Sequence, residues 1–203
     1  MSEPARLVRL VLATANLDKA HEIEAIFAPM ADRFELVPRP DHIGDIEETG
    51  GTLEENALLK ARALCEATGL PALADDTGLE VDALGGAPGV YSARYAGEAA
   101  SYADNVAKLI HEMERRSDRR ACFSTVAAAA FPDGRELVAR GSVAGELAEA
   151  PAGQNGFGYD PLFRPDEGDG RTFAEMSRDE KNALSHRGRA FRLLAERLAA
   201  QIA

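Results

Sequence analysis

The chain contains no hydrophobic run that is long enough to cross a membrane. A membrane span needs about 20 consecutive apolar residues, and no window of this sequence approaches that length. Residues 1–6 lead into only a short apolar stretch, without the ordered charged, apolar and small-residue regions of a secretory signal. We therefore expect a cytoplasmic protein that has no membrane partner.

Cysteine is scarce, and acidic residues outnumber basic ones. Cys65 lies in a helical pattern and Cys122 in a strand-like run, and neither belongs to a Cys-x-x-Cys pair, so we expect two buried, reduced thiols. The formal net charge of −11 argues against nucleic acid as the main partner, because neutralising phosphates requires a basic surface. A free nucleotide stays compatible with this charge, since a small polyanion can enter a locally basic pocket or bring a divalent cation with it.

Internal repeats and linker-like segments are also absent from the sequence. The 203 residues fit one domain, residues 1–203, which can fold as two lobes around a cleft. Strand-like and helical patterns alternate along it. The predicted strands are residues 7–13, 34–37, 72–74, 78–84, 121–131 and 136–148, the last two forming a hairpin. The predicted helices are residues 18–27, 52–69 and 101–116, a short helix capped by Ser177, and a last helix from residue 185. This order indicates an α/β protein with a mixed sheet.

The first candidate site is the segment from Thr14 to Lys19, which follows a buried strand and opens a helix that Asp18 can cap. Free backbone N–H groups and the helix dipole favour an anion at such a place. Lys19 adds a positive charge, and Thr14 and Asn16 add hydrogen-bond donors. The segment matches neither the P-loop nor the dinucleotide-binding fingerprint. It is either a phosphate-binding turn or a capped turn with a surface lysine.

Asp75 and Asp76 form the second candidate, at the end of an apolar strand. Because successive side chains of a strand point to opposite faces, one carboxylate can face a ligand while the other anchors the backbone. With Glu47 and Glu48 from the acidic loop at 41–51, they would supply the hard oxygen ligands that Mg²⁺ prefers. The alternative is a turn with exposed acids, although ligands of α/β proteins bind at the carboxyl ends of strands.

The third candidate is the glycine-rich loop from Gly156 to Pro161. Its glycines would let an aromatic ring lie against a flat ligand, and Asp160 can accept a hydrogen bond from the edge of a base. An ordinary loop with a buried aromatic anchor explains the same residues equally well.

The fourth candidate lies at residues 180–187, where Ser185 can cap the last helix and Lys181 and Arg187 form a second basic site. A capping motif with incidental charge is the alternative. Together, the four candidates supply a triphosphate site, a metal site and a site for a flat base, which nucleotide hydrolysis requires.

These motifs, in this order, resemble those of the inosine triphosphate pyrophosphatase family, the non-standard purine nucleotide (XTP/dITP) pyrophosphatases. The resemblance covers nearly the whole chain. It rests on four blocks: Thr14-Ala15-Asn16 with Lys19; Glu47-Glu48-Thr49-Gly50 with Glu55-Asn56-Ala57 and Lys60-Ala61; Ala74 to Leu79 with Leu84 to Arg94; and Phe157 to Pro161 with Lys181 and Ser185-His186-Arg187. One departure is Ala15, where the family often has glycine, and alanine fits there if its φ is negative.

The resemblance implies an elongated mixed-sheet α/β fold with a cleft between two lobes, a homodimer, and hydrolysis of ITP, dITP or XTP to the monophosphate and pyrophosphate. It implies Mg²⁺, or Mn²⁺ as a substitute, with Asp76 as general base and metal ligand and Glu48 as a second metal ligand. The substrate-binding residues that it implies are Thr14, Ala15, Asn16, Leu17, Asp18, Lys19, Thr77, Phe157, Gly158, Tyr159, Asp160, Lys181, His186 and Arg187.

The hypothesis assigns Asp76 either to proton removal from the attacking water or chiefly to holding the metal, and Lys19 to stabilising phosphate charge. For the base, we expect Arg187 or a nearby backbone N–H to donate to O6, and the region of Asp160 to accept from N1–H. Adenine presents the reverse pattern.

Two other functions are alternatives to this hypothesis. A non-catalytic nucleotide sensor would favour cations at the phosphates over a carboxylate cluster. A Maf-type pyrophosphatase for modified pyrimidines is disfavoured by the block Ser185-His186-Arg187.

Overall fold

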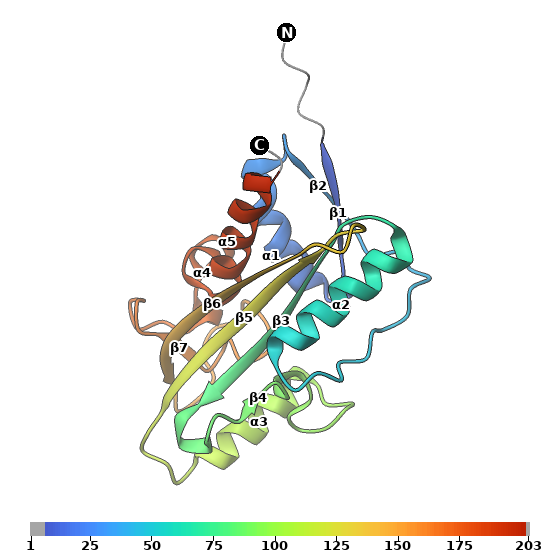
Figure 1. Cartoon of the computed structure of the whole chain (residues 1–203). Coiled ribbons are helices and arrows are strands. Elements are labelled where there is room, and N and C mark those ends of the chain that lie inside the picture. Colours follow the sequence, from blue (N-terminus) through green and yellow to red (C-terminus); the bar gives the residue numbers. More distant parts are fainter. Residues whose placement is uncertain (1–6, 202–203) are drawn as a thin grey trace. The chain divides into compact units, whose positions relative to one another are not determined.

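The structure is a computed structural model that describes residues 7–201. Its α-helices are α1 (Leu17–Phe27), α2 (Leu53–Thr68), α3 (Tyr102–Met113), α4 (Arg178–Leu184) and α5 (His186–Gln201). Its strands are β1 (Val8–Leu12), β2 (Phe34–Val37), β3 (Ala72–Val81), β4 (Pro88–Gly89), β5 (Arg120–Ala130), β6 (Glu136–Leu147) and β7 (Phe163–Pro165). The strands form one sheet in the order β2-β1-β3-β5-β6-β7, and β4 pairs with β3 (Figure 1). β1 is parallel to β2 and β3, whereas β4 and β7 are antiparallel to their partners. The predicted α/β class with a mixed sheet is confirmed.

The described part of the chain forms two compact units. Unit 1 holds the described residues of 1–76, 126–140 and 190–203, and unit 2 holds residues 77–125 and 141–189. The four boundaries fall inside β3, β5, β6 and α5, which explains why no linker is visible in the sequence. The cleft and the single-domain assignment of residues 1–203 stay predictions.

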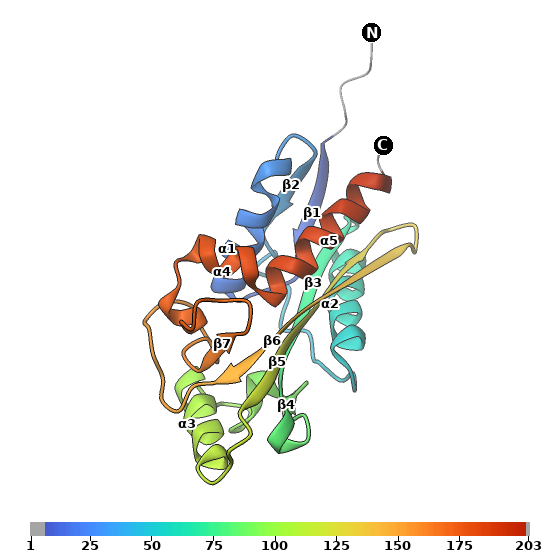
Figure 2. The same ribbon diagram turned by 90° about the vertical axis from the view of Figure 1, so that its left-hand side faces the viewer.

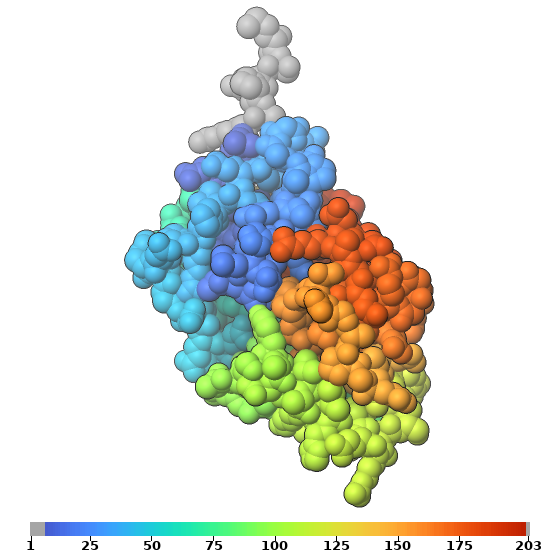
Figure 3. Space-filling model, turned by 180° about the vertical axis from the view of Figure 1, so that it is seen from behind, coloured from blue at the N-terminus to red at the C-terminus, as the bar shows by residue number. Residues whose placement is uncertain are grey.

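Unit 1 has helices on both faces of its strands (Figures 1 and 2). On one face, α1 and α5 pack against the strands, and the core on this face includes Leu10, Leu12, Ile23, Phe27, Leu73, Phe191 and Leu194. The outer side of α1, in blue in Figure 3, is exposed, as expected for an amphipathic helix. Strand residues that alternate with this core are also buried and small, such as Ala72 and Ala74, and they lie on the face covered by α2.

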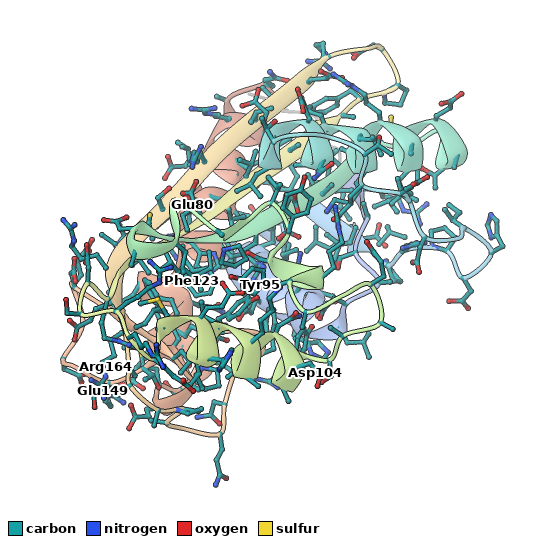
Figure 4. The ribbon with its side chains drawn as sticks, turned by 90° about the horizontal axis from the view of Figure 1, so that it is seen from below. Glu80, Tyr95, Asp104, Phe123, Glu149 and Arg164 are labelled. Atoms are coloured by element: carbon teal, nitrogen blue, oxygen red, sulfur yellow. The ribbon has the colours of Figure 1, made fainter. Side chains whose placement is uncertain are left out.

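Unit 2 has a core of its own, in which α3 packs against the strands. Phe123 and Tyr95 lie between α3 and the strands (Figure 4). Phe123 also packs edge-on against Phe163 of β7, with 4.9 Å between the ring centroids. The backbone comes close at Gly145, because a Cβ atom there would lie 2.2 Å from the carbonyl oxygen of Arg164.

Two local predictions were wrong. Asn16, not Asp18, caps α1, because the Asn16 side chain accepts hydrogen bonds from the N–H groups of Asp18 and Lys19. Asp75 and Asp76 do not end a strand, since β3 continues through them to Val81. The predicted cap at Ser177 is present, and Thr52, Ser101 and Ser177 form capping boxes at the starts of α2, α3 and α4. Gly69 ends α2 in the left-handed conformation.

Two further expectations concern cysteine and membranes. Both thiols are free, with Cys65 buried and Cys122 half-buried. Among residues 7–201, no helix combines the length and apolar character that a membrane span requires.

Candidate active site

The first candidate segment begins α1 in unit 1. Thr14 Oγ1 accepts a hydrogen bond from the N–H of Asn16 at 3.1 Å. Asn16 Oδ1 accepts from the N–H groups of Asp18 and Lys19 at 2.9 and 3.3 Å. The sequence pattern predicts free N–H groups here for a phosphate. In the structure, the N–H groups of Asp18 and Lys19 both donate to Asn16. No described residue other than glycine has a positive φ, so Ala15 fits its position.

Asp75 and Asp76 are buried and bind lysines from different helices of unit 1. Asp75 Oδ2 lies 3.3 Å from the Nζ atom of Lys19 on α1. Asp76 Oδ1 lies 3.4 Å from the Nζ atom of Lys60 on α2. Successive strand residues point to opposite faces, and here each face carries a different helix. The two adjacent carboxylates therefore have separate partners.

Glu48, Asn56, Lys60 and Asp76 form a group that we call the carboxylate–lysine cluster. The Nζ atom of Lys60 lies 2.5 Å from Oε1 of Glu48, so one ammonium group contacts both Glu48 and Asp76. Glu47, the neighbour of Glu48, is exposed. Only one of the two predicted acidic-loop residues thus reaches the described cluster.

Asn56 binds the carboxylate of Asp76 and also connects the cluster to the acidic loop. Its side chain is fully buried, and its Nδ2 donates to Oδ2 of Asp76 at 3.1 Å. Its Oδ1 accepts from the N–H of Gly50 at 2.8 Å, which ties the acidic loop to α2. A Cβ atom at Gly50 would lie 2.6 Å from that same oxygen, so the contact requires glycine. Because Asn56 and Lys60 are four residues apart, both lie on the face of α2 that meets Asp76.

The cluster shifts the pKa of two of its members. Burial raises the pKa of the Asp76 carboxyl group above its ordinary value, and the positive charge of Lys60 offsets only part of this effect. Burial alone would lower the pKa of Lys60, but the carboxylates of Asp76, Asp75 and Glu48 together raise it. Asp76 is thus a stronger base than a free aspartate, and Lys60 stays charged.

The donor set of the cluster fits a divalent cation such as Mg²⁺. Glu48 and Asp76 lie close enough to share the ammonium group of Lys60, which shows that one cation can contact both carboxylates. In residues 7–201, no three His, Cys, Asp or Glu side chains are grouped for metal binding. Mg²⁺ takes one or two carboxylates and completes its shell with water and phosphate oxygens, so the pair Glu48 and Asp76 has the chemistry of such a ligand set.

In unit 2, the glycine-rich loop is built around Asp160. The buried Oδ2 atom of Asp160 accepts from the N–H of Phe157 at 2.7 Å and from Nζ of Lys181 at 2.6 Å. Gly156 has a φ of 69°, and a Cβ atom there would lie 2.2 Å from the same Oδ2. The third and fourth sequence candidates are therefore one structural group, since Lys181 of α4 holds the loop through Asp160.

The ring of Phe157 lies close to two cations. The Nζ atom of Lys181 lies 4.6 Å and the Cζ atom of Arg187 5.3 Å from the ring centroid. Both cations are almost completely buried. A flat aromatic ring beside a buried guanidinium provides stacking and hydrogen-bond donors, the two features by which a base is bound.

The other predicted site residues of unit 2 are Thr77, Gly158, Tyr159 and His186. Arg187 Nη2 donates to Oγ1 of Thr77 at 3.1 Å. The buried ring of His186 is stacked on Phe123 at a centroid distance of 4.5 Å. Tyr159 is a core residue whose hydroxyl donates to the carbonyl oxygen of Ser92 at 3.0 Å. Gly158 has a φ of 60°, which lets the loop turn.

Lys60 and Asn56 are site residues that our sequence reasoning did not assign. Both occur in the matched blocks, in a stretch whose pattern predicts only a helix. The signal that could have indicated them is an asparagine and a lysine four residues apart, among the apolar positions of that helix.

Fold and site together define a mixed-sheet α/β protein with a carboxylate–lysine cluster in one unit and an aromatic ring flanked by cations in the other. The chain belongs to the Ham1 family, whose model matches residues 10–197. The family resemblance indicated by the sequence motifs is thereby confirmed.

Relatives of known name agree with this assignment. A dITP/XTP pyrophosphatase of Streptomyces coelicolor is 52% identical over 192 residues, covering 93% of this chain and 96% of the relative. One from Nitratidesulfovibrio vulgaris is 52% identical over 199 residues, covering 92% and 94%. Among solved structures, a HAM1 protein from Coxiella burnetii matches with a TM-score of 0.86 and 42% identity, covering 95% of this chain and 99% of that one.

Proposed function

We propose that this protein hydrolyses non-standard purine nucleoside triphosphates, namely ITP, dITP and XTP, to the monophosphate and pyrophosphate. The observation that carries the proposal is the contact of Asp76 and Glu48 with one half-buried cation, the ammonium group of Lys60. A pure binder of phosphates has no use for two carboxylates at this place, whereas a hydrolase needs a base and ligands for a metal ion. The names of relatives about 50% identical to this chain support the same activity.

In this proposal, unit 1 handles the triphosphate. Asp76 accepts a proton from the water whose attack on phosphorus breaks the bond between the α- and β-phosphates and releases pyrophosphate. Its raised pKa makes it a stronger base for this step than a free aspartate. Asn56 holds the Asp76 carboxylate in a fixed orientation. Lys60 and Lys19 stabilise the negative charge that builds up on the phosphate oxygens.

A divalent cation is part of the proposal, with Glu48 and Asp76 as its protein ligands. When bound, Mg²⁺ would neutralise phosphate oxygens and lower the cost of generating hydroxide, and Mn²⁺ would substitute for it. We also propose a homodimer that works in the cytoplasm, on the strength of the family resemblance. Size-exclusion chromatography with light scattering tests the dimer, and a mass of one 21.7 kDa chain would refute it.

Unit 2 would read the base. A 6-keto purine has an acceptor at O6 and a donor at N1–H, and adenine has the opposite pattern. Arg187 can only donate, so beside O6 it favours hypoxanthine and xanthine over adenine. The Oδ2 atom of Asp160 already accepts hydrogen bonds from the loop and from Lys181, so we assign to Asp160 first the role of positioning the loop. That its region accepts from N1–H stays a prediction. Guanine shares the 6-keto edge, so its 2-amino group must be what the site rejects.

A competition assay tests the substrate class. Pyrophosphate release is measured for ITP, XTP and dITP against ATP, GTP and the pyrimidine triphosphates, each with Mg²⁺. We expect the first three to be hydrolysed far faster than the others, because a polar mismatch at the base can cost about 10⁴-fold in kcat/KM. Preferred hydrolysis of pyrimidine triphosphates would favour the Maf-type alternative. Tight binding of ITP without turnover would favour a sensor.

A further inference from the structure

A buried chain of hydrogen bonds in unit 2 connects residues of the proposed base site. Thr125 on β5 has no exposed surface. Its Oγ1 atom lies 2.6 Å from Oγ1 of Thr77 and 2.7 Å from Nδ1 of His186. Thr77 Oγ1 also accepts from Nη2 of Arg187. A single hydroxyl group, absent from all the sequence motifs, thus lies between His186 and the pair of Thr77 and Arg187.

The same strand holds the ring of His186 in two ways. Phe123 and Thr125 are two residues apart on β5, so their side chains point to the same face. Phe123 stacks on the imidazole ring at an interplanar angle of 25°, and Thr125 binds the Nδ1 atom at the ring edge. Ser124, between them, points to the other face and bonds with Ser142 on β6 at 2.9 Å. Stacking fixes the plane of the ring, and Thr125 fixes its rotation within that plane.

The order of donors in this chain is restricted. The guanidinium group of Arg187 can only donate, and each threonine hydroxyl has one proton to give. If Thr125 donates to Nδ1, neutral His186 has its proton on Nε2, and Thr77 can donate to Thr125. If Nδ1–H donates to Thr125 and Thr125 donates to Thr77, the Thr77 proton must point elsewhere. The tautomer of His186 is therefore coupled to the orientation of the Thr77 hydroxyl.

We propose that Thr125 is a positioning residue of the base site, which fixes the tautomer of His186 and, through Thr77, the orientation of Arg187. The inference rests on the proposed function for its effect on base selection. Thr125 acts through His186 and Thr77, so it needs no contact with the nucleotide. Its loss should lower selectivity for the base more than it lowers the rate of the chemical step.

Three variants test the proposal. Thr125→Val keeps the shape of the side chain but removes the hydroxyl, whereas Thr125→Ser keeps the hydroxyl and removes a methyl group. Ser124→Ala is the matched control, because it deletes a buried hydroxyl from the adjacent residue, on the other face of β5. We expect Thr125→Val to reduce the ITP/ATP ratio of kcat/KM by about tenfold, the effect of one lost buried hydrogen bond. Thr125→Ser and Ser124→Ala should retain the wild-type ratio. An unchanged ratio in Thr125→Val, with both substrates slowed equally, would overturn the proposal.

A second readout does not depend on turnover. The chain has four histidines, and His186 is buried whereas His21, His42 and His111 are exposed. The ¹⁵N shifts of its ring, assigned by comparison with His186→Gln, report the tautomer in the nucleotide-free protein. We expect one tautomer in the wild type and in Thr125→Ser, and a changed or mixed state in Thr125→Val.

The His186 signal also separates a failure of the proposed function from a failure of the proposed role of Thr125. If the wild type did not hydrolyse ITP, the proposed function would fail, but the His186 signal would still decide the role of Thr125. An identical His186 tautomer in the wild type and Thr125→Val would reject that role.

Discussion

Asp75 and Asp76 are consecutive residues of β3, yet each binds a lysine from a different helix on a different face of the strand. Asp75 lies 3.3 Å from Lys19 of α1, and Asp76 lies 3.4 Å from Lys60 of α2. The alternation of a β-strand thus divides two identical side chains between two environments. Asp76 belongs to the carboxylate–lysine cluster with Glu48 and Asn56, so we assign the chemistry to Asp76 and a supporting role to Asp75.

The two carboxylates should respond differently to the same substitution. Asp76→Asn should lower kcat by about 10²–10⁴-fold, since the amide keeps the shape but cannot act as a base. Asp75→Asn should instead cost about 1–3 kcal/mol in the free energy of unfolding, because Lys19 loses its charged partner. Steady-state kinetics and urea unfolding of both variants check this. Near-normal kcat in Asp76→Asn would show that Asp76 is not the base.

The raised pKa of Asp76 predicts how stability depends on pH in the metal-free protein. Burial raises its folded-state pKa above the unfolded value of about 4. Its contribution to stability is therefore fully present below that pH and is lost as pH rises through the folded pKa. Asp76→Asn removes this loss. In excess EDTA, the variant should gain stability over the wild type as the pH rises above about 4. A constant difference as the pH rises would mean that the pKa of Asp76 is not raised.

Metal dependence can be tested on the two neighbouring glutamates. Activity should disappear in excess EDTA and return with Mg²⁺ or Mn²⁺. Glu48→Gln should raise the Mg²⁺ concentration needed for half-maximal activity, because a ligand charge is lost. Glu47→Gln is the control, since Glu47 is exposed, and should behave like the wild type. Full activity in EDTA would exclude the metal site.

Base selection should depend on the planar guanidinium of Arg187. Arg187→Lys keeps the charge but loses the forked donors, so the ITP/ATP ratio of kcat/KM should fall about tenfold or more. Arg189→Lys makes the same change two residues further on, at a side chain that binds Glu167 and the carbonyl oxygens of Leu184 and Ser142. It should leave the ratio unchanged. If Arg187→Lys kept the wild-type ITP/ATP ratio, as Arg189→Lys is expected to do, Arg187 would be assigned to structure or phosphate binding.

Much of the fold was predictable because its signals are local. The capping box of Thr52 and Glu55 and the αL residue Gly69 define α2 at both ends. β3 was predicted as two pieces, because Asp75 and Asp76 interrupt its apolar pattern. Their burial depends on lysines that come from elsewhere in the sequence, and a strand pattern contains no information on such partners.

The same limit applied to the site. The motifs indicated Asp76, Glu48, Lys181 and Asp160, but not which groups pair. Lys181 binds Asp160 and Asn56 binds Asp76, and each of these contacts joins positions about 20 residues apart in the sequence. Thr125 lies in an apolar strand with no motif around it. Only the structure shows its two partners, the hydroxyl group of Thr77 and the imidazole ring of His186.

In the proposed reaction, this chain cleaves ITP between the α- and β-phosphates with Asp76 as the base. Phosphorus-31 NMR of ITP with the protein and Mg²⁺ tests it directly, with Asp76→Asn in parallel. We expect IMP and pyrophosphate in equal amounts from the wild type, and almost no product from the variant. IDP with inorganic phosphate, or ITP left intact by the wild-type protein, would contradict it.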